Sequence, residues 1–98
     1  MEFTKVIEGS KLTYTVSGRL DTNTSPDLND DIAASLTDVS ELVMDIKDLE
    51  YISSAGVRVL LSAYKVMKKQ GTKILRNVPE VVRNVLSVTG LLDFFTIE

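Results

Sequence analysis

The feature that most constrains this fold is the alternation of short strand-like segments with amphipathic helical segments along the chain. Two strand-like segments come first, at residues 3–8 and 12–17, and in the second of these apolar residues alternate with hydroxyl residues. Alternation with period two is typical of a strand that buries one face. The Gly9-Ser10 pair between the two segments therefore predicts an antiparallel hairpin, and the polar stretch 18–24 is expected to be a loop.

Three helical segments follow the hairpin. The first begins at residues 25–27, where Ser-Pro-Asp offers a hydroxyl cap, a proline for the first turn and an acid at the positive end of the helix dipole. The second has the strongest helical spacing in the chain and is expected to run from about Ala55 to Gln70, ending at Gly71. The third is expected to open at residues 79–80, Pro-Glu, and to close at Gly90.

Three further strands complete the pattern. The apolar run Leu42–Ile46 predicts a central strand covered on both faces, and Thr72–Arg76 and Phe94–Ile97 predict two short strands. The order is ββαβαβαβ, and strand–helix–strand connections in series require parallel pairing with right-handed crossovers. We therefore expect an α/β fold in one domain over residues 1–98. Its sheet is mixed but mostly parallel, with an N-terminal β-hairpin and with helices mainly on one face.

Composition excludes several kinds of chemistry. The chain of 98 residues has no His and no Cys, so it lacks thiolate metal sites, disulfides and the commonest general base. Its five glycines are too scattered for either phosphate-cradling motif. Asp45, Asp48 and Glu50 match no calcium-loop spacing and are better explained as turn and capping residues. No catalytic residue, metal or cofactor is expected.

Charge is unevenly distributed along the chain. Residues 20–50 hold nine acidic residues and one basic, whereas residues 51–83 hold seven basic residues and one acidic. Such asymmetry can dock a charged partner, but opposite charges on the solvent faces of neighbouring helices explain it more simply. The basic stretch 65–76 lacks interleaved aromatics, so direct nucleic-acid binding is not expected. No apolar run approaches the roughly 20 residues of a membrane span, so a soluble cytoplasmic protein is expected.

One segment stands apart from the rest. Ser53 and Ser54 precede Ala55 and Gly56 where the central strand gives way to the second helix. Ordinary N-capping explains one serine. It does not explain the glycine, which costs roughly 0.5–1 kcal/mol inside a helix. Small residues there let another molecule approach the helix N-terminus, where free N–H groups and the dipole stabilise a phosphate.

Three short motifs are together more specific than the serine pair. Gly18–Asp21 reads G-x-L-D, Asp48–Val57 reads D-L-x-x-[IVM]-[DS]-S-[STA]-G-[LV], and Thr89–Phe95 reads T/S-G-L-x-x-x-F. With these motifs the chain resembles the STAS domain of bacterial anti-sigma factor antagonists, in the same element order from Phe3 to Glu98. The resemblance implies the STAS fold over essentially the whole chain.

The resemblance also implies a partner switch. The unmodified family member binds an anti-sigma factor, which is also a serine kinase of the histidine-kinase-like ATPase fold, and sigma factor is released. The kinase phosphorylates the antagonist, and a metal-dependent serine phosphatase reverses this. Matched to the family motif, the phosphoacceptor is Ser54, with Ser53 as second choice. The same matching assigns partner contacts to Asp21, Thr22, Ser53, Ala55, Gly56 and Val57.

Two departures from the family pattern keep alternatives open. Ser53 stands where the family often has Asp, and Ala55 replaces a Ser. One rival is a non-phosphorylated STAS scaffold or regulatory subunit of a signalling or transport complex. A second is a small enzyme with a serine nucleophile, which lacks a visible base. For the switch, Ser54 is expected in the first helical turn or at the cap, partly exposed, with the Asp21 loop at the same end of the molecule.

Overall fold

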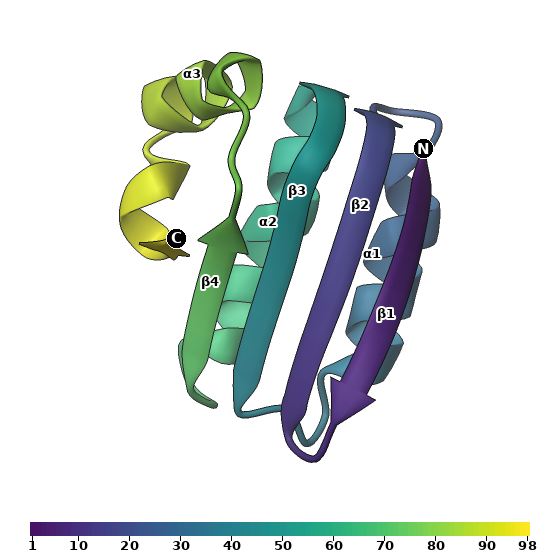
Figure 1. Cartoon of the computed structure of the whole chain (residues 1–98), viewed down its shortest axis with the longest axis vertical. Helices are drawn as coiled ribbons and strands as arrows, with labels where there is room; N and C mark the ends of the chain where they lie inside the picture. The colour runs from purple at the N-terminus through teal and green to yellow at the C-terminus, as the bar shows by residue number, and fades with distance from the viewer.

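Five strands form a single sheet in the order β1-β2-β3-β4-β5 in the computed structural model, which describes all residues from 1 to 98 (Figure 1). Strand β1 pairs antiparallel with β2, and every other neighbouring pair is parallel. The strands are β1 (Glu2–Glu8), β2 (Lys11–Leu20), β3 (Glu41–Ile52), β4 (Thr72–Arg76) and β5 (Thr96–Ile97). The helices are α1 (Ser25–Ser35), α2 (Ser54–Met67), α3 (Glu80–Thr89) and a 3₁₀ turn (Leu91–Phe94). The predicted α/β fold, its element order and its N-terminal hairpin are confirmed.

The hydrophobic core lies between the sheet and two helices. Helices α1 and α2 pack side by side on one face of the sheet, while α3 sits beyond the end of β4 (Figure 1). Apolar positions four residues apart on α1 and on the inner face of α2 are buried against alternate residues of β2 and β3. These core residues include Leu12, Tyr14, Val16, Leu28, Ile32, Leu42, Met44, Ile46, Leu60, Ala63 and Met67.

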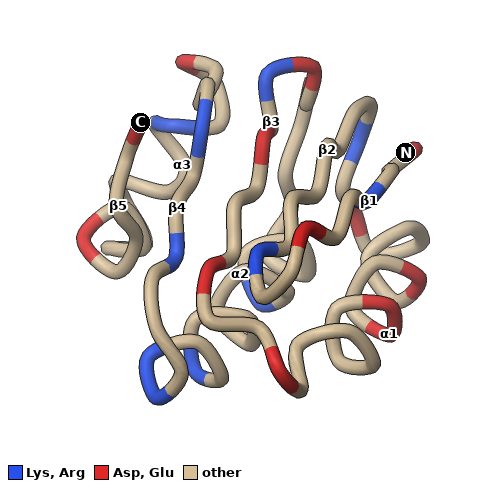
Figure 2. Tube along the Cα trace, turned by 60° about the horizontal axis from the view of Figure 1, so that its bottom comes forward, with Lys and Arg blue, Asp and Glu red and all other residues tan.

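Charged side chains follow this layering. Acidic residues lie along α1, including Asp27, Asp30 and Asp31, and no Lys or Arg lies on that helix (Figure 2). Basic residues lie on α2, β4 and α3, as Figure 2 shows. Asp31 has an internal partner on the core side, since its carboxylate accepts from the Tyr14 hydroxyl at 2.5 Å and from Lys5 at 3.0 Å. The simpler interpretation therefore holds only in part, because Glu41, Asp45, Asp48 and Glu50 lie on β3 and Lys73 and Arg76 lie on β4.

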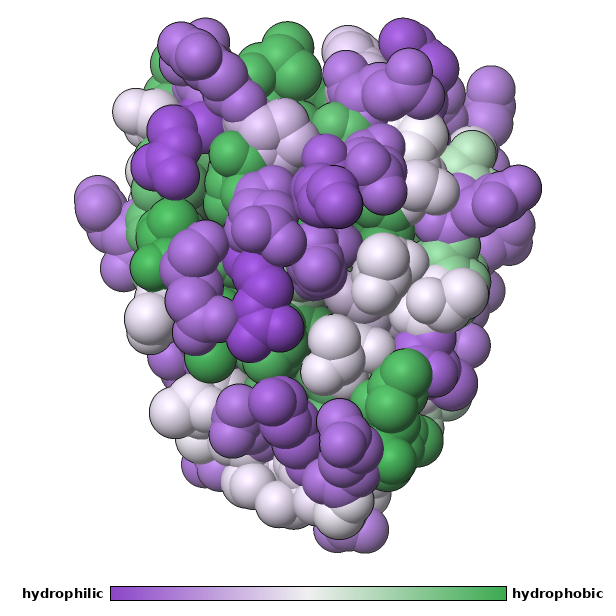
Figure 3. Space-filling model, viewed as in Figure 1, coloured by the Kyte–Doolittle hydropathy of each residue, from purple (hydrophilic) through white to green (hydrophobic).

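The other face of the sheet carries no helix and is largely polar (Figure 3). Val43 is nevertheless fully buried there, flanked in register by Thr13 on β2 and Ile74 on β4. The prediction that the Leu42–Ile46 run is a central strand covered on both faces is therefore confirmed, although only one of the two faces is covered by helices. Side chains of adjacent strands shield the second face at this position.

Two strands are longer than the sequence predicts. The stretch expected to be a loop from residue 18 still belongs to β2 as far as Leu20, and β3 continues past Ile46 to Ile52. Asp48 therefore lies on a strand rather than in a loop. Pairing continues across two register irregularities until Leu20 faces Ile52. The buried residues of the β3 extension, Leu49 and Ile52, stand three apart rather than two, so the period-two signal of a strand is absent there.

Helix ends also differ from expectation in part. The α2 helix stops at Met67 rather than near Gln70, and Gly71 does not cap it. A side chain at Gly71 would collide with the backbone of Ser40, so this glycine serves a close approach between two chain segments. Gly90 does end α3 in the left-handed conformation, as predicted, with φ of 78°. The last strand begins after the 3₁₀ turn, so Phe94 lies outside it.

Candidate functional site

The parallel sheet brings the Asp21 loop and the start of α2 to the same end of the molecule. Leu20 and Ile52 are register partners at the carboxyl ends of adjacent parallel strands. The Ser53 amide donates to the Leu20 carbonyl at 2.9 Å, which ties the two strand ends together. Asp21 and Ser54 follow these two ends directly, although they are far apart in sequence. Their expected placement at one end is confirmed (Figure 1).

The two serines at the start of α2 have different roles. Ser53 is the N-cap, in extended backbone, and its Oγ accepts from the Gly56 amide at 3.3 Å. Ser54 is the first helical residue, is exposed, and its hydroxyl has no hydrogen-bond partner within the chain. The expectation that Ser54 lies in the first turn with an exposed side chain is confirmed. The Ser54 hydroxyl can therefore be modified without breaking a hydrogen bond, whereas modification of the Ser53 hydroxyl would disturb the helix cap.

Gly56 has an internal reason to be glycine. A Cβ atom there would lie 2.7 Å from Ile52 Cγ1 and 2.8 Å from the Leu20 carbonyl oxygen. Helix α2 thus starts in direct contact with the ends of β2 and β3, and Gly56 is buried. The expectation that Gly56 offers a surface to a partner is corrected, because its small size admits the chain's own backbone. Ala55 and Val57 beside it are half-buried and remain accessible.

A groove of about 330 Å³ lies between the N-terminal halves of α1 and α2. Thr22 and Ser25 border it on one side, and Ala55 and Arg58 border it on the other. Ser25 is 3% exposed, and its Oγ has no hydrogen-bond partner. Neither Ser25 nor Arg58 was expected in the site from sequence. The position of Arg58 one helical turn after Ser54 is the signal that points to it.

Asp21 holds its own loop in shape. Its carboxylate accepts from the Asn23 amide at 3.0 Å and from the Thr24 amide at 3.1 Å, and the Thr24 hydroxyl oxygen lies 3.1 Å from the same carboxylate oxygen. The hydrogen bond from the Thr24 amide is the main reason that the pKa of Asp21 lies below its ordinary value. Thr22, next to it, is exposed at the rim of the groove. Of the two loop residues expected at the partner surface, Asp21 thus has a structural role as well.

Residues 2–98 match the family model of the STAS domain. This chain belongs to the STAS domain family. Over 83 residues it is 29% identical to the anti-sigma-B factor antagonist of Bacillus subtilis (strain 168), an alignment that spans 84% of this chain and 76% of that relative.

Solved structures of antagonists share the fold of this STAS domain. The unphosphorylated form of SpoIIAA matches with a TM-score of 0.87 at 20% identity, covering 99% of this chain and 88% of that one. The phosphorylated form of SpoIIAA, from Bacillus, matches with a TM-score of 0.79 at 19% identity, covering 99% and 91%. An anti-sigma factor antagonist from Mycobacterium paratuberculosis matches with a TM-score of 0.86 at 26% identity, covering 98% and 83%.

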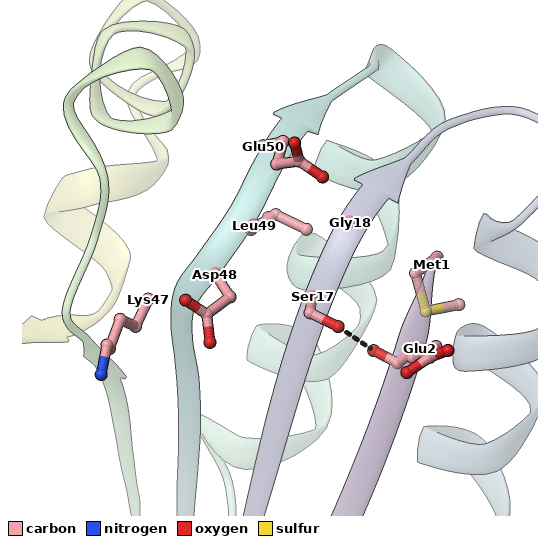
Figure 4. Close-up of a pocket in the computed structure, with 8 residues that line it drawn as sticks. All are labelled: Met1, Glu2, Ser17, Gly18, Lys47, Asp48, Leu49 and Glu50. Atoms are coloured by element: carbon pink, nitrogen blue, oxygen red, sulfur yellow. Dashed lines mark hydrogen bonds between the residues drawn. The ribbon is translucent and has the colours of Figure 1, made fainter.

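A second hollow, of about 650 Å³, lies on the open face of the STAS sheet (Figure 4). Its carboxylates, from Glu2, Asp48 and Glu50, come from two strands and point in different directions rather than toward one centre. The chain has no cluster of three side chains able to hold a metal ion. Asp45 lies on β3 and not in a turn, and its carboxylate accepts from the Lys47 amide at 3.1 Å and from Asn77 Nδ2 at 3.2 Å. No helix is long and apolar enough to cross a bilayer.

Proposed function

We propose that this STAS domain is an anti-sigma factor antagonist that phosphorylation of Ser54 switches off. Unmodified, it binds an anti-sigma factor serine kinase of the histidine-kinase-like ATPase fold, and sigma factor is released. The observation that carries the proposal is the exposed, unbonded hydroxyl of Ser54 at the first position of α2. Similarity to proteins named anti-sigma factor antagonists supports the same function.

The contact surface in this proposal is the end of the molecule where β2 and β3 finish. Ser54 stands at its centre, with Ala55 and Val57 on α2 and Thr22 on the neighbouring loop. These side chains are short, so a partner can approach the hydroxyl closely. The STAS domain acts as a binding protein and substrate, and it is not itself an enzyme. A metal-dependent serine phosphatase resets the switch.

Phosphoryl transfer uses one atom of this chain. The Ser54 oxygen attacks the γ-phosphorus of ATP held by the kinase, the bond to the β-phosphate oxygen breaks, and ADP leaves. The hydroxyl proton passes to a base of the kinase, because this chain has no His and no carboxylate bonded to Ser54. Ser53 is a poorer acceptor, since modification of its oxygen would end the cap at Gly56.

The phosphate disrupts binding without disrupting the fold. It adds about −1.5 to −2 charges at neutral pH, and a helix N-terminus stabilises such charge by roughly 0.3–1 kcal/mol. Within a close-packed interface the same group must lose its hydration, and it finds no room. We expect the affinity for the kinase to fall about 30- to 1000-fold, or about 2–4 kcal/mol.

Identification of the partner comes first in the experimental test. The tagged STAS domain is used to capture its kinase from the source cell, and the purified kinase is incubated with it and ATP. Mass spectrometry then locates the phosphate. We expect it on Ser54, absent in Ser54→Ala and retained in Ser62→Ala, a matched change at another exposed serine of α2. Phosphate on Ser53, or binding with no phosphorylation at all, would contradict the proposal; the latter result would favour the scaffold function.

Calorimetry of the same pair tests the switch itself. Ser54→Ala should bind the kinase as tightly as the unmodified protein, and Ser54→Asp should reproduce part of the loss caused by phosphate. Equal affinity for the phosphorylated and unmodified proteins would rule out the switch, whatever the site of modification.

A further inference from the structure

Arg58 is an exposed cation beside the groove, and it has no partner of its own. It makes no ion pair and no side-chain hydrogen bond, whereas Arg76 pairs with Glu98 at 2.7 Å and Arg19 lies 4.2 Å over the ring of Tyr51. A guanidinium without a counter-ion is available to an incoming anion. Its position on α2 decides which anion can reach it.

Ser54 and Arg58 lie four residues apart on the same helix, so their side chains emerge on adjacent turns of one face. Ala55 and Val59, next to Arg58, face α1 across the groove. Arg58 therefore lines the groove and lies one helical turn from Ser54. From this position its long side chain can reach either the groove or Ser54.

The groove itself is rich in hydrogen-bond donors. Besides Arg58 it contains the Ser25 hydroxyl, which is buried and unbonded, a state that proteins normally avoid unless a ligand completes it. Asp30 lies on the same α1 wall and disfavours an anion deep in the groove. An anion at this site is therefore held on the α2 side, against Arg58.

We propose that Arg58 is the internal counter-ion of phosphorylated Ser54. The proposal rests on the proposed function, because it requires phosphate at that residue. In the unmodified protein the guanidinium borders the groove and is free to contact the anti-sigma factor. Once Ser54 carries phosphate, the guanidinium pairs with it. Phosphorylation then changes the docking surface in two ways. It adds a dianion at Ser54, and it draws the Arg58 guanidinium away from the groove.

The test installs phosphoserine at position 54 during expression, by genetic-code expansion, so that no kinase is needed. The second pKa of the phosphate, about 6 in ordinary phosphoserine, is measured by phosphorus NMR across a pH titration. A nearby cation favours the dianion and lowers this pKa. We expect Arg58→Gln to raise it by about 0.5 pH units, the size expected for one exposed charge a few ångströms away. Arg58→Lys should restore most of the difference.

Arg83→Gln is the matched control, because Arg83 is exposed on α3 and likewise makes no ion pair. It should leave the phosphate pKa unchanged. The Arg58 Nε–Hε signal in nitrogen NMR should also move on phosphorylation, whereas that of Arg83 should not. Equal phosphate pKa values in the two glutamine variants would overturn the proposal.

Failure of this proposal is distinguishable from failure of the proposed function. Because the phosphate is installed without a kinase, the titration reports only on Arg58. A finding that the captured kinase does not modify Ser54 would overturn the proposed function and leave the titration result standing.

Discussion

Helices α1 and α2 both begin with serine, but the two serines lie in opposite environments. Ser25 opens α1 and is buried, with no partner for its hydroxyl. Ser54 opens α2 and is exposed. The preceding residue makes part of the difference. Ser53 caps α2 with its side chain, whereas Thr24, at the same position before α1, makes no cap bond.

The Thr24 hydroxyl is used elsewhere. It donates to the Arg19 carbonyl at 2.8 Å and accepts from the Asp21 amide at 2.9 Å, so it closes the loop between β2 and α1. The prediction that Ser25 supplies the hydroxyl cap of α1 is therefore wrong. The comparison teaches that a serine at a helix start becomes available for modification when its neighbour caps the helix and tertiary packing leaves it exposed.

Gly56→Ala should have the largest effect among changes at these helix starts. At an unconstrained helical position this substitution stabilises a protein by up to about 1 kcal/mol. Here the new Cβ would press on the Leu20 carbonyl, which cannot move aside without shifting β2. We expect a net loss of about 1–3 kcal/mol in the free energy of unfolding, measured by urea denaturation. Ser62→Ala, exposed on the same helix, should be nearly neutral. A stabilised Gly56→Ala variant would show that α2 does not start in tight contact with the sheet.

Ser53→Ala and Ser54→Ala form a matched pair that tests the stability contributed by the N-cap of α2. Ser53→Ala removes the cap of α2 and should cost about 1 kcal/mol. Ser54→Ala removes an exposed hydroxyl without a partner and should change the unfolding free energy by less than about 0.5 kcal/mol. Thermal and urea unfolding of both variants measure the difference. If Ser54→Ala were the more damaging change, the assignment of cap and free hydroxyl would be reversed.

The start of α2 could be predicted from the sequence because its signals are local. Capping serines, helical apolar spacing, Pro79 before α3 and Gly90 after it all act within a few residues of where they stand. The element order followed from the same local patterns. So did the meeting of the Asp21 loop with α2, because parallel strands bring their carboxyl ends together.

Features that depend on contacts across the fold could not be predicted in this way. The last residues of β2 and β3 pair across two register irregularities, so their buried residues Leu20, Leu49 and Ile52 do not follow the alternation of a regular strand. A side chain at position 56 would collide with Leu20, and one at position 71 would collide with Ser40. Each colliding residue is distant in sequence from its glycine. The burial of Ser25 likewise depends on how α1 packs against α2, which the sequence around Ser25 does not reveal.

Asp21→Asn tests the loop that separates the two helix starts. The pKa of Asp21 is lowered in the folded protein, so its ionised form stabilises the fold. This contribution is complete above the ordinary Asp pKa of about 3.9 and is lost as the pH falls through the lowered folded value. We expect Asp21→Asn to melt slightly below the unmutated protein at pH 7, with the gap closing in acid. A gap for Asp21→Asn that stays constant down to strong acid would contradict the role of the charge.

Ser25→Ala should change the free energy of unfolding least. The sign of that change shows whether the Ser25 hydroxyl is truly without a hydrogen bond. A buried hydroxyl without a partner costs stability, and alanine removes that cost and favours the helix more strongly. The gap left by the oxygen takes back part of the gain. We therefore expect the free energy of unfolding to rise by about 0.5 kcal/mol, whereas Ser53→Ala lowers it. If Ser25→Ala instead destabilised the protein by about 1 kcal/mol or more, the hydroxyl would be hydrogen-bonded in solution. The two helix starts would then differ in the burial of their serines, but Ser25 would no longer be a buried hydroxyl without a hydrogen bond. The groove would also lose the Ser25 hydroxyl as a free donor.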